Sequence, residues 1–480
     1  MKVLLINPPY IDLYGPIKVS AGRYFPLGLG YLASFLRKSG YQVRFLDLEV
    51  ERTSYAALKR IVSEYDPEVI GITSVTPTFN NAVKIANIIK EVSLATVVFG
   101  GVHASALPES ILQSCKAADI VVVGEGELTM LEICKYLENP NNQDLRDIDG
   151  IVFRRETEII RTMPRGVINN LDSLPFPARD LVDIHRYSPH PYVNRGKKST
   201  TLITSRGCPS SCTFCASHLT MGKKFRIHSP DYVVGEMEEL IKNYGIKYFI
   251  INDDTFTIDE ERTVQICEKI LSKGLDIDWY CFMRVNNVKE DLVKLMKRAG
   301  CSSIGFGVES VDETILKNLK KRITPDQCIK AFNICNGLGI KTLAFFIFGS
   351  PGDTLQIANR NIKFAKKLKP VLAFFNMFVP YPGTEVFNEN YKGRISLDNL
   401  DDFVAIGPEA VVSNSLISKD GLRRMVLKAN VQFYIRPVQL WRILKHIKTL
   451  AELKVHLLAG YGWFLQLLSW MENKRTKHSS

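Results

Sequence analysis

In the first part of the chain, short apolar runs alternate with segments in which apolar residues recur at helical spacing. The runs predict strands, and the segments between them predict helices. Continuous apolar strands separated by helices indicate a parallel sheet covered by helices on both faces. The expected strands are residues 2–7, 42–48, 69–73, 95–99 and 119–123, and the expected helices are residues 27–39, 56–65 and 82–92.

The same alternation resumes on a larger scale near residue 200. Six strand–helix units predict an α/β fold of the TIM type, closed into a barrel or a partial (β/α)6 barrel. Active sites of such barrels lie at the carboxyl ends of the strands. The expected strands are residues 200–205, 248–251, 278–282, 303–308, 342–348 and 372–378, and the expected helices are residues 232–244, 260–273, 289–299, 325–337 and 356–368.

A chain of 480 residues is too long for one hydrophobic core, so we expect several domains. We assign residues 1–150 to a Rossmann-like domain and residues 199–395 to the barrel. Residues 151–198 form a connector, because the segment Leu174-Pro175-Phe176-Pro177 is too rich in proline for a helix or an inner strand. Residues 396–480 form a mostly helical, basic C-terminal region.

Small, hydroxylated and glycine-rich turns follow the expected strands of the first domain. In open parallel sheets, ligands bind beyond the carboxyl ends of the strands, and such turns let a large ligand approach the backbone. No G-x-G-x-x-G follows the first strand, so a standard dinucleotide site is not expected. The candidate ligand-binding residues are Asn7, Pro8, Thr73, Ser74, Thr76, Gly100, Gly101, His103, Gly124, Glu125 and Gly126.

Three of the ten cysteines, Cys208, Cys212 and Cys215, are clustered with C-x₃-C-x₂-C spacing after the first expected barrel strand. Three thiolates on one loop can hold three irons of a [4Fe–4S] cluster and leave the fourth iron open. A structural zinc site would need a fourth ligand at a suitable spacing, and none is found. The alternative is three core cysteines that are close by chance. The other seven are scattered and are interpreted as buried thiols of a reducing cytoplasm.

The motif C-x₃-C-x-aromatic-C at the end of a first barrel strand resembles the radical S-adenosylmethionine (SAM) superfamily. The resemblance implies that the open iron binds the amino and carboxylate groups of SAM. An electron from the cluster would then cleave SAM to a 5′-deoxyadenosyl radical. Turns after the later strands are similar to those that contact the SAM amino group, the ribose or carboxylate, and the adenine. The corresponding residues here are Asp253, Asp254, Arg284, Glu309, Ser310, Gly349 and Gly352.

The first domain and the connector resemble the cobalamin-binding class of this superfamily. Besides the turns named above, the resemblance includes Leu174-Pro175-Phe176-Pro177 and the late segment Phe433-Tyr434-Ile435-Arg436-Pro437. The motif D-x-H-x-x-G, whose histidine binds cobalt in methionine-synthase-like domains, is absent from this sequence. Cobalamin is therefore implied only by resemblance. His103 is a candidate for facing the ligand, and the alternative is that it is a packing residue. For the first domain as a whole, the alternative is that it binds no corrin.

These cofactors together imply a radical C-methyltransferase that acts on an unactivated carbon of a small molecule, with a lipid or isoprenoid as one substrate class. Rearrangement, oxidation or ring formation on a lipid or tetrapyrrole is the main alternative, because similar enzymes share the same motifs. Methylthiotransfer is disfavoured, since Cys115 and Cys134 are too far apart to form the extra cysteine cluster of those enzymes. A cluster-binding sensor would leave the SAM-like turns without a role. No individual catalytic residue is assigned.

The net charge of +12 is concentrated at the C-terminal end. Residues 421–480 contain 11 Lys or Arg and 2 acidic residues, so 11 − 2 = +9 lies there. Nucleic acid is not an expected partner, because no basic stripe continues into the domains. We expect a cytoplasmic protein that receives electrons from a donor such as flavodoxin or ferredoxin.

The basic and apolar tail resembles an interfacial membrane anchor, which would place the protein at the inner membrane face. The alternative is an apolar helix that caps the barrel. The residues concerned are Arg442, Lys445, Lys448, Lys454, Leu457, Leu458, Trp463, Phe464, Leu467, Leu468 and Trp470.

Overall fold

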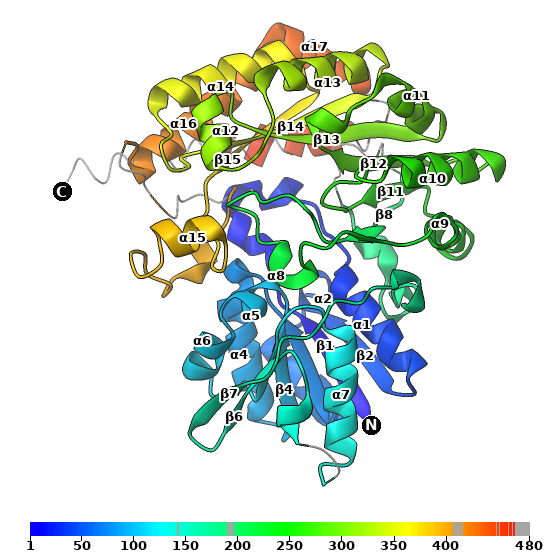
Figure 1. Ribbon diagram of the computed structural model, residues 1–480, viewed down its shortest axis with the longest axis vertical. Coiled ribbons are helices and arrows are strands. Elements are labelled where there is room, and N and C mark those ends of the chain that lie inside the picture. Colours follow the sequence, from blue (N-terminus) through cyan, green and yellow to red (C-terminus); the bar gives the residue numbers. More distant parts are fainter. Residues whose placement is uncertain are drawn as a thin grey trace.

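A computed structural model describes residues 1–141, 144–189, 194, 197–406, 412, 416–447, 449–450, 452–458, 460–462 and 464–465. Within them, two sheets of mainly parallel strands lie one above the other, each flanked by helices (Figure 1). The predicted fold class is confirmed. The tail residues Lys448, Trp463, Leu467, Leu468 and Trp470 lie outside the described residues. No helix in the described part of the chain is long and apolar enough to cross a membrane.

The first sheet has the strand order β2-β1-β3-β4-β5-β6-β7. Its first five strands are parallel, and β6 and β7 add an antiparallel hairpin that the sequence analysis assigned to the connector. The strands are β1 (Lys2–Asn7), β2 (Gln42–Asp47), β3 (Val69–Thr73), β4 (Thr96–Gly100), β5 (Ile120–Val122), β6 (Ile151–Arg155) and β7 (Glu158–Arg161). The helices are α1 (Leu27–Lys38), α2 (Leu48–Glu51), α3 (Tyr55–Tyr65), α4 (Phe79–Lys90), α5 (Val102–Ala106), α6 (Pro108–Ser114) and α7 (Glu127–Glu138).

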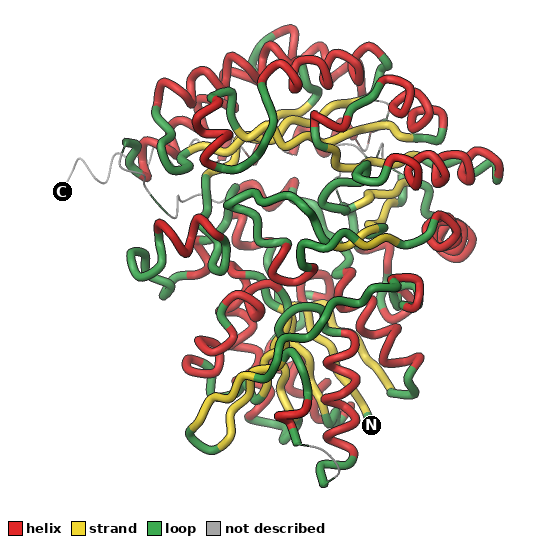
Figure 2. The backbone as a smooth tube through the Cα atoms, viewed as in Figure 1, coloured by secondary structure: helices red, strands yellow, loops and turns green. Residues whose placement is uncertain are grey.

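The second sheet contains six parallel strands in the order β15-β14-β13-β12-β11-β8, as expected for an open barrel. Helices cover its outer face (Figure 2). The strands are β8 (Ser199–Leu202), β11 (Tyr248–Ile251), β12 (Asp278–Met283), β13 (Cys301–Glu309), β14 (Lys341–Phe348) and β15 (Leu372–Met377). The helices from α8 on are α8 (His218–Met221), α9 (Pro230–Tyr244), α10 (Glu260–Ser272), α11 (Glu290–Arg298), α12 (Glu313–Asn318), α13 (Pro325–Gly337), α14 (Leu355–Leu368), α15 (Glu385–Asn390), α16 (Lys419–Tyr434) and α17 (Pro437–His446).

The first barrel strand is shorter than the predicted 200–205. It ends at Leu202, and Ser205–Arg206 (β9) instead pairs with Arg226–Ile227 (β10) in a separate two-stranded sheet. The cause is Asp253, whose buried carboxylate accepts hydrogen bonds from the Thr204 N–H and from the Thr204 and Ser205 hydroxyls, each at 2.6 Å. These bonds draw the chain out of the sheet and toward the loop that carries the cysteines.

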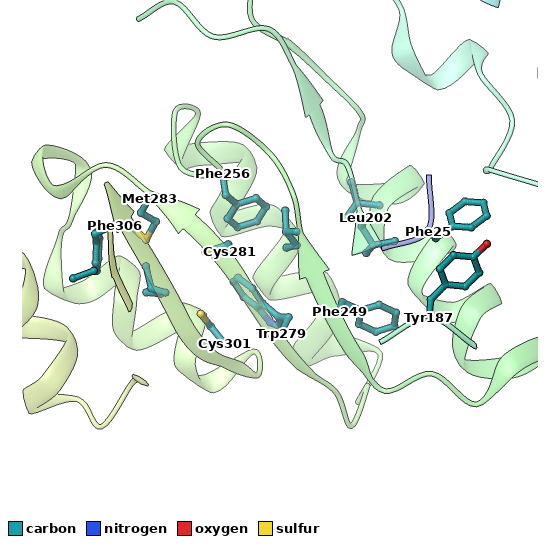
Figure 3. Packing of buried hydrophobic residues seen from close by; sticks show 14 of the residues in the cluster. Phe25, Tyr187, Leu202, Phe249, Phe256, Trp279, Cys281, Met283, Cys301 and Phe306 are labelled. Atoms are coloured by element: carbon teal, nitrogen blue, oxygen red, sulfur yellow. The ribbon is translucent and has the colours of Figure 1, made fainter. Parts of the chain in front are cut away.

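One apolar core continues from the first domain into the barrel (Figure 3). Phe25 of the first domain packs edge-on against Tyr187 of the connector, with ring centroids 5.7 Å apart. The same core includes Leu202 on β8 and Trp279 on β12. Because protein interiors are close-packed, this shared core fixes the position of the first sheet relative to the barrel.

Candidate active site

The loop after β9 begins with a backbone conformation that requires glycine. Gly207 has φ +84°, and a Cβ there would lie 2.2 Å from the carbonyl oxygen of Lys224. The chain then passes through Cys208, Cys212 and Cys215, which are free, half-buried thiols. The other seven cysteines are buried free thiols, as predicted.

The three thiols open onto one cavity of about 560 Å³ at the carboxyl ends of the barrel strands. All six strands, or the turns after them, contribute to its wall. Apolar side chains form one part of the lining, and charged side chains from different strands form another. The apolar group is Phe214, Phe282, Met283 and Phe345, and the charged group includes Asp254, Arg284, Glu309, Lys321, Lys223, Glu385 and Glu389.

Polar groups surround the thiols on two sides. Arg284 Nη1 lies 3.9 Å from Cys212 Sγ, and its other terminal nitrogen donates to the carbonyl of Lys321. Cys215 Sγ lies 3.3 Å from Ser217 Oγ, and burial raises the pKa of the Cys215 thiol. The guanidinium therefore places a positive charge beside one of the candidate iron ligands.

A buried ion pair lies next to Arg284. Lys321 Nζ is 2.7 Å from Glu309 Oε1, and both side chains are largely shielded from solvent. Burial acts to lower the pKa of Lys321, but the neighbouring Glu309 carboxylate raises it above its usual value. Glu309 has φ +61°, a conformation that non-glycine residues rarely adopt and that is concentrated at functional sites.

The structure brings Asp254, Arg284 and Glu309 to this cavity, as expected for SAM-binding residues. Burial raises the pKa of the Asp254 carboxyl. Sequence reasoning missed Lys321, which comes from the turn after α12. It stands in a run of basic residues, Lys320-Lys321-Arg322, but nothing local indicates which of them faces Glu309.

Four other predicted SAM-binding residues do not line the cavity. Asp253 is 1% exposed, and its carboxylate accepts hydrogen bonds from the loop after β8. The Ser310 hydroxyl accepts from the Asp312 N–H at 3.1 Å. The turn that contains Gly349 and Gly352 packs beneath α16, where a Cβ on Gly349 would lie 2.5 Å from Leu422. Direct contact of these four residues with SAM stays a prediction.

The carboxyl edge of the first sheet meets the barrel beside this cavity. Gly383, in the turn after β15, has φ +82°, and a Cβ there would lie 2.8 Å from Leu219 on α8 and 3.1 Å from Ala106 on α5. Helix α8 follows the cysteine loop and lies between the two sheets in Figure 1. The cysteine loop and the first domain's edge therefore flank the same space.

Several predicted residues of this edge hold the turns together. The Gly100 carbonyl accepts from the Ser74 N–H at 2.9 Å, and the Ser74 carbonyl accepts from the His103 N–H at 3.2 Å. Gly101 has φ +95°, and a Cβ there would lie 2.7 Å from the Ser74 carbonyl oxygen. The Asn7 amide donates to Asp47 at 2.9 Å. Pro8, Thr73, Gly124 and Gly126 lie at or beside the strand ends, as predicted.

His103 is turned into the protein. The ring is 1% exposed, lies 4.5 Å from the Phe79 ring between centroids, and has Nδ1 3.3 Å from Thr76 Oγ1. Burial lowers the pKa of His103 to about 4. These contacts favour the packing role that the sequence analysis gave as the alternative to a role facing the ligand.

The buried His103 predicts a pH dependence of stability. The folded state disfavours the charged ring, whereas the unfolded chain takes up the proton near pH 6.5, so the free energy of unfolding falls as pH drops from about 6.5 to about 4. The expected loss over this window is about 3 kcal/mol. Urea unfolding of the wild type and of His103→Gln across this range measures it. An equal slope in both proteins would contradict the assignment.

Glu125, predicted as a cofactor ligand, instead lies at the domain boundary. Its carboxylate accepts from Arg206 and Arg226 of the cysteine-bearing segment, each at 2.9 Å, and from the Ile168 N–H at 2.8 Å. Glu127 accepts from Arg206 at 2.7 Å. We call these four charged residues, Glu125, Glu127, Arg206 and Arg226, the boundary network; their side chains are between 2% and 6% exposed.

The residues present fit the two expected groups. Each of the three thiols can bind a different iron of a four-iron cluster, and they need not converge on one ion. No three His, Cys, Asp or Glu side chains in the described ranges form a site for a single metal ion. At the first domain's edge, a Cβ added to Gly100 or Gly126 would meet no atom within 4 Å, and the buried Ser74 hydroxyl has no hydrogen-bond partner among the described residues.

Comparison with known protein families matches residues 202–365 to the Radical SAM superfamily and residues 16–134 to the B12 binding domain. The chain is 35% identical, over 91% of its length, to an uncharacterized methyltransferase of Pyrococcus horikoshii, of which it covers 93%. The chain belongs to the cobalamin-dependent radical SAM enzymes. The chain is also 27% identical to the anaerobic magnesium-protoporphyrin IX monomethyl ester cyclase of Cereibacter sphaeroides, over 91% of the chain and 71% of the relative.

Solved structures of cobalamin-dependent radical SAM enzymes share the fold. The enzyme OxsB, with aqua-cobalamin and SAM bound, matches 95% of this chain and 72% of its own, with a TM-score of 0.71 and 19% identity. The methyltransferase TsrM of Kitasatospora setae, with cobalamin and a [4Fe–4S] cluster bound, matches 80% and 73%, with a TM-score of 0.67 and 20% identity. At this identity the similarity concerns the fold.

Proposed function

We propose that this protein is a radical SAM methyltransferase that transfers a methyl group to an unactivated carbon of a small molecule. The observation that carries the proposal is the single cavity in which Cys208, Cys212 and Cys215 open beside the carboxyl edge of the first domain. When bound, the cluster, SAM and cobalamin would supply a carbon radical and a methyl group. Methyltransferase activity is also supported by the Pyrococcus relative.

The chain's own residues would hold and shield these groups. The three thiolates would bind the cluster, and Arg284 would stay beside Cys212 as a counter-charge. The charged side chains Asp254, Glu309 and Lys321 line the cavity and would hold the amino, carboxylate or hydroxyl groups of SAM. The aromatic wall around Phe282 and Phe345 would exclude water from the reacting carbon.

A ring-forming reaction is the second candidate, because the cyclase relative matches 91% of the chain. The two functions are separated by anaerobic reconstitution with iron, sulfide and cobalamin, followed by incubation with reductant and SAM that carries a labelled methyl group. A methyltransferase is expected to release S-adenosylhomocysteine and to retain label on the corrin or a product. Formation of 5′-deoxyadenosine without S-adenosylhomocysteine would favour the ring-forming alternative. Absence of stoichiometric cobalt would contradict both.

We also propose a substrate class, an electron donor and a cellular location for this protein. A lipid substrate is supported by the hopanoid C-3 methylase of Methylococcus capsulatus, which is 27% identical over 83% of the chain. An electron donor such as flavodoxin or ferredoxin is required by the chemistry. The ten free cysteines support a reducing cytoplasmic compartment. A peripheral membrane contact is proposed for the C-terminal region.

A further inference from the structure

Helix α17 turns its apolar side away from the protein. Val438, Leu440, Trp441 and Leu444 are 64%, 49%, 68% and 55% exposed. The buried side carries Gln439, whose amide donates to the carbonyls of Pro370 and Val371 at 3.3 and 2.8 Å. A helix on a water-exposed surface has the opposite arrangement. We call the four exposed residues the α17 apolar face.

The apolar surface begins before the helix. Val431 and Ile435, at the end of α16 and in the turn after it, are 37% and 67% exposed. Contiguous exposed apolar side chains of this kind mark an interaction site. Trp441 is the only tryptophan of the described residues with a largely exposed side chain, since Trp279 is fully buried. Tryptophan is favoured at the boundary between lipid headgroups and acyl chains.

The segment from residue 421 to the end of α17 carries charges of one sign. Residues 421–447 contain six Lys or Arg and no Asp or Glu. Burial lowers the pKa of the Arg436 guanidinium. Burial and the neighbouring positive charge of Arg436 lower the pKa of the Arg442 guanidinium. Lys366 on the adjacent helix α14 has a lowered pKa, caused by burial and by Arg436 and Lys363. For Arg442 and Lys366, an anionic surface would offset the smaller part of the shift, which comes from neighbouring positive charges.

The described residues after α17 do not cover the face. Glu452 is 1% exposed and lies 3.4 Å from Lys341 Nζ at the start of β14, so this part of the tail packs against the barrel. The structure thus favours the capping alternative for residues near Glu452. The apolar residues of α17, by contrast, face outward.

We propose that α17 is an interfacial membrane helix that lies on an anionic lipid bilayer, with Trp441 and Leu444 in the acyl boundary and the surrounding Lys and Arg side chains at the lipid phosphates. An exposed apolar face bordered by basic residues is the pattern of such helices. The arrangement adds a docking surface to the protein, independent of the reaction that the cavity carries out.

The test is co-sedimentation of the full-length holoprotein with vesicles made of equal parts phosphatidylglycerol and phosphatidylcholine, or of phosphatidylcholine alone. We expect binding to the anionic vesicles that weakens with salt. Trp441→Glu/Leu444→Glu should weaken it by at least about tenfold, since two apolar side chains leave the acyl boundary. Leu94→Glu is the matched control, because Leu94 is a fully exposed leucine of the first domain; it should bind like the wild type.

Two results would overturn the proposal. One is unchanged vesicle binding by the double variant. The other is a wild type that ignores vesicles but self-associates, together with a monomeric double variant, which would assign the face to a second copy of the chain. Reductant-driven SAM cleavage in detergent-free buffer should be the same in all three proteins, which shows that the variants are folded and hold the cluster.

Discussion

Cys212→Ala is expected to abolish reductive cleavage of SAM and to lower the iron content from about four per chain toward zero. The thiol is one of three that open onto the cavity, and Arg284 lies 3.9 Å from its sulfur. Two thiolates cannot keep a cluster that needs three protein ligands and one open iron. Iron analysis, the visible spectrum and the yield of 5′-deoxyadenosine under dithionite measure the effect.

The matched control is Cys115→Ala. Cys115 is a buried free thiol of the first domain and does not line the cavity, so its loss should cost packing but leave iron and SAM cleavage intact. Full iron and full cleavage in Cys212→Ala would contradict the assignment of the cluster. Loss of iron in both variants would indicate a folding defect rather than loss of a ligand.

Breaking the boundary network is expected to separate SAM cleavage from methyl transfer. Arg206→Met leaves the buried Glu127 carboxylate without its ion-pair partner. This change should lower the free energy of unfolding by about 3–5 kcal/mol. Arg206 also stands immediately before Gly207 and the cluster cysteines, while Glu125 and Glu127 follow the first domain's last parallel strand. The two halves of the site should therefore lose their mutual position. More 5′-deoxyadenosine per methylated product is expected.

Two further variants separate positioning from stability. Arg179→Met breaks another buried ion pair, in which Arg179 and Glu236 are 2.6 Å apart and each side chain is 2% exposed. It should lower stability by a similar amount without changing the ratio of 5′-deoxyadenosine to methylated product. Arg206→Met/Glu127→Leu removes both charges and should regain stability while the ratio stays altered. A ratio equal to that of the wild type in both Arg206 variants would show that the network only stabilises the fold.

The sequence alone determined the features that depend on local spacing. Three thiols within eight residues must lie on one loop, so the cluster motif required no knowledge of the fold. Runs such as Val3-Leu4-Leu5-Ile6 are buried on both faces of a parallel sheet, which is why strand and helix periodicity predicted the parallel strands of both sheets. The seven scattered cysteines were predicted to be buried for the same local reason.

Tertiary structure decided which polar side chains face the cavity. Asp253 and Asp254 are adjacent, yet one holds the loop after β8 and the other lines the site. Glu125 lies between two glycines of a turn predicted to bind the cofactor. Its carboxylate nevertheless accepts hydrogen bonds from Arg206 and Arg226, which are about 80 to 100 residues away in the chain. Helix α17 carries Arg442 and Lys445 of the predicted basic tail, but only its neighbours in the fold show which side of the helix is buried. The direction in which a polar side chain points, and the group it contacts, depend on elements distant in the chain. The periodicity of the sequence carries no information about those elements.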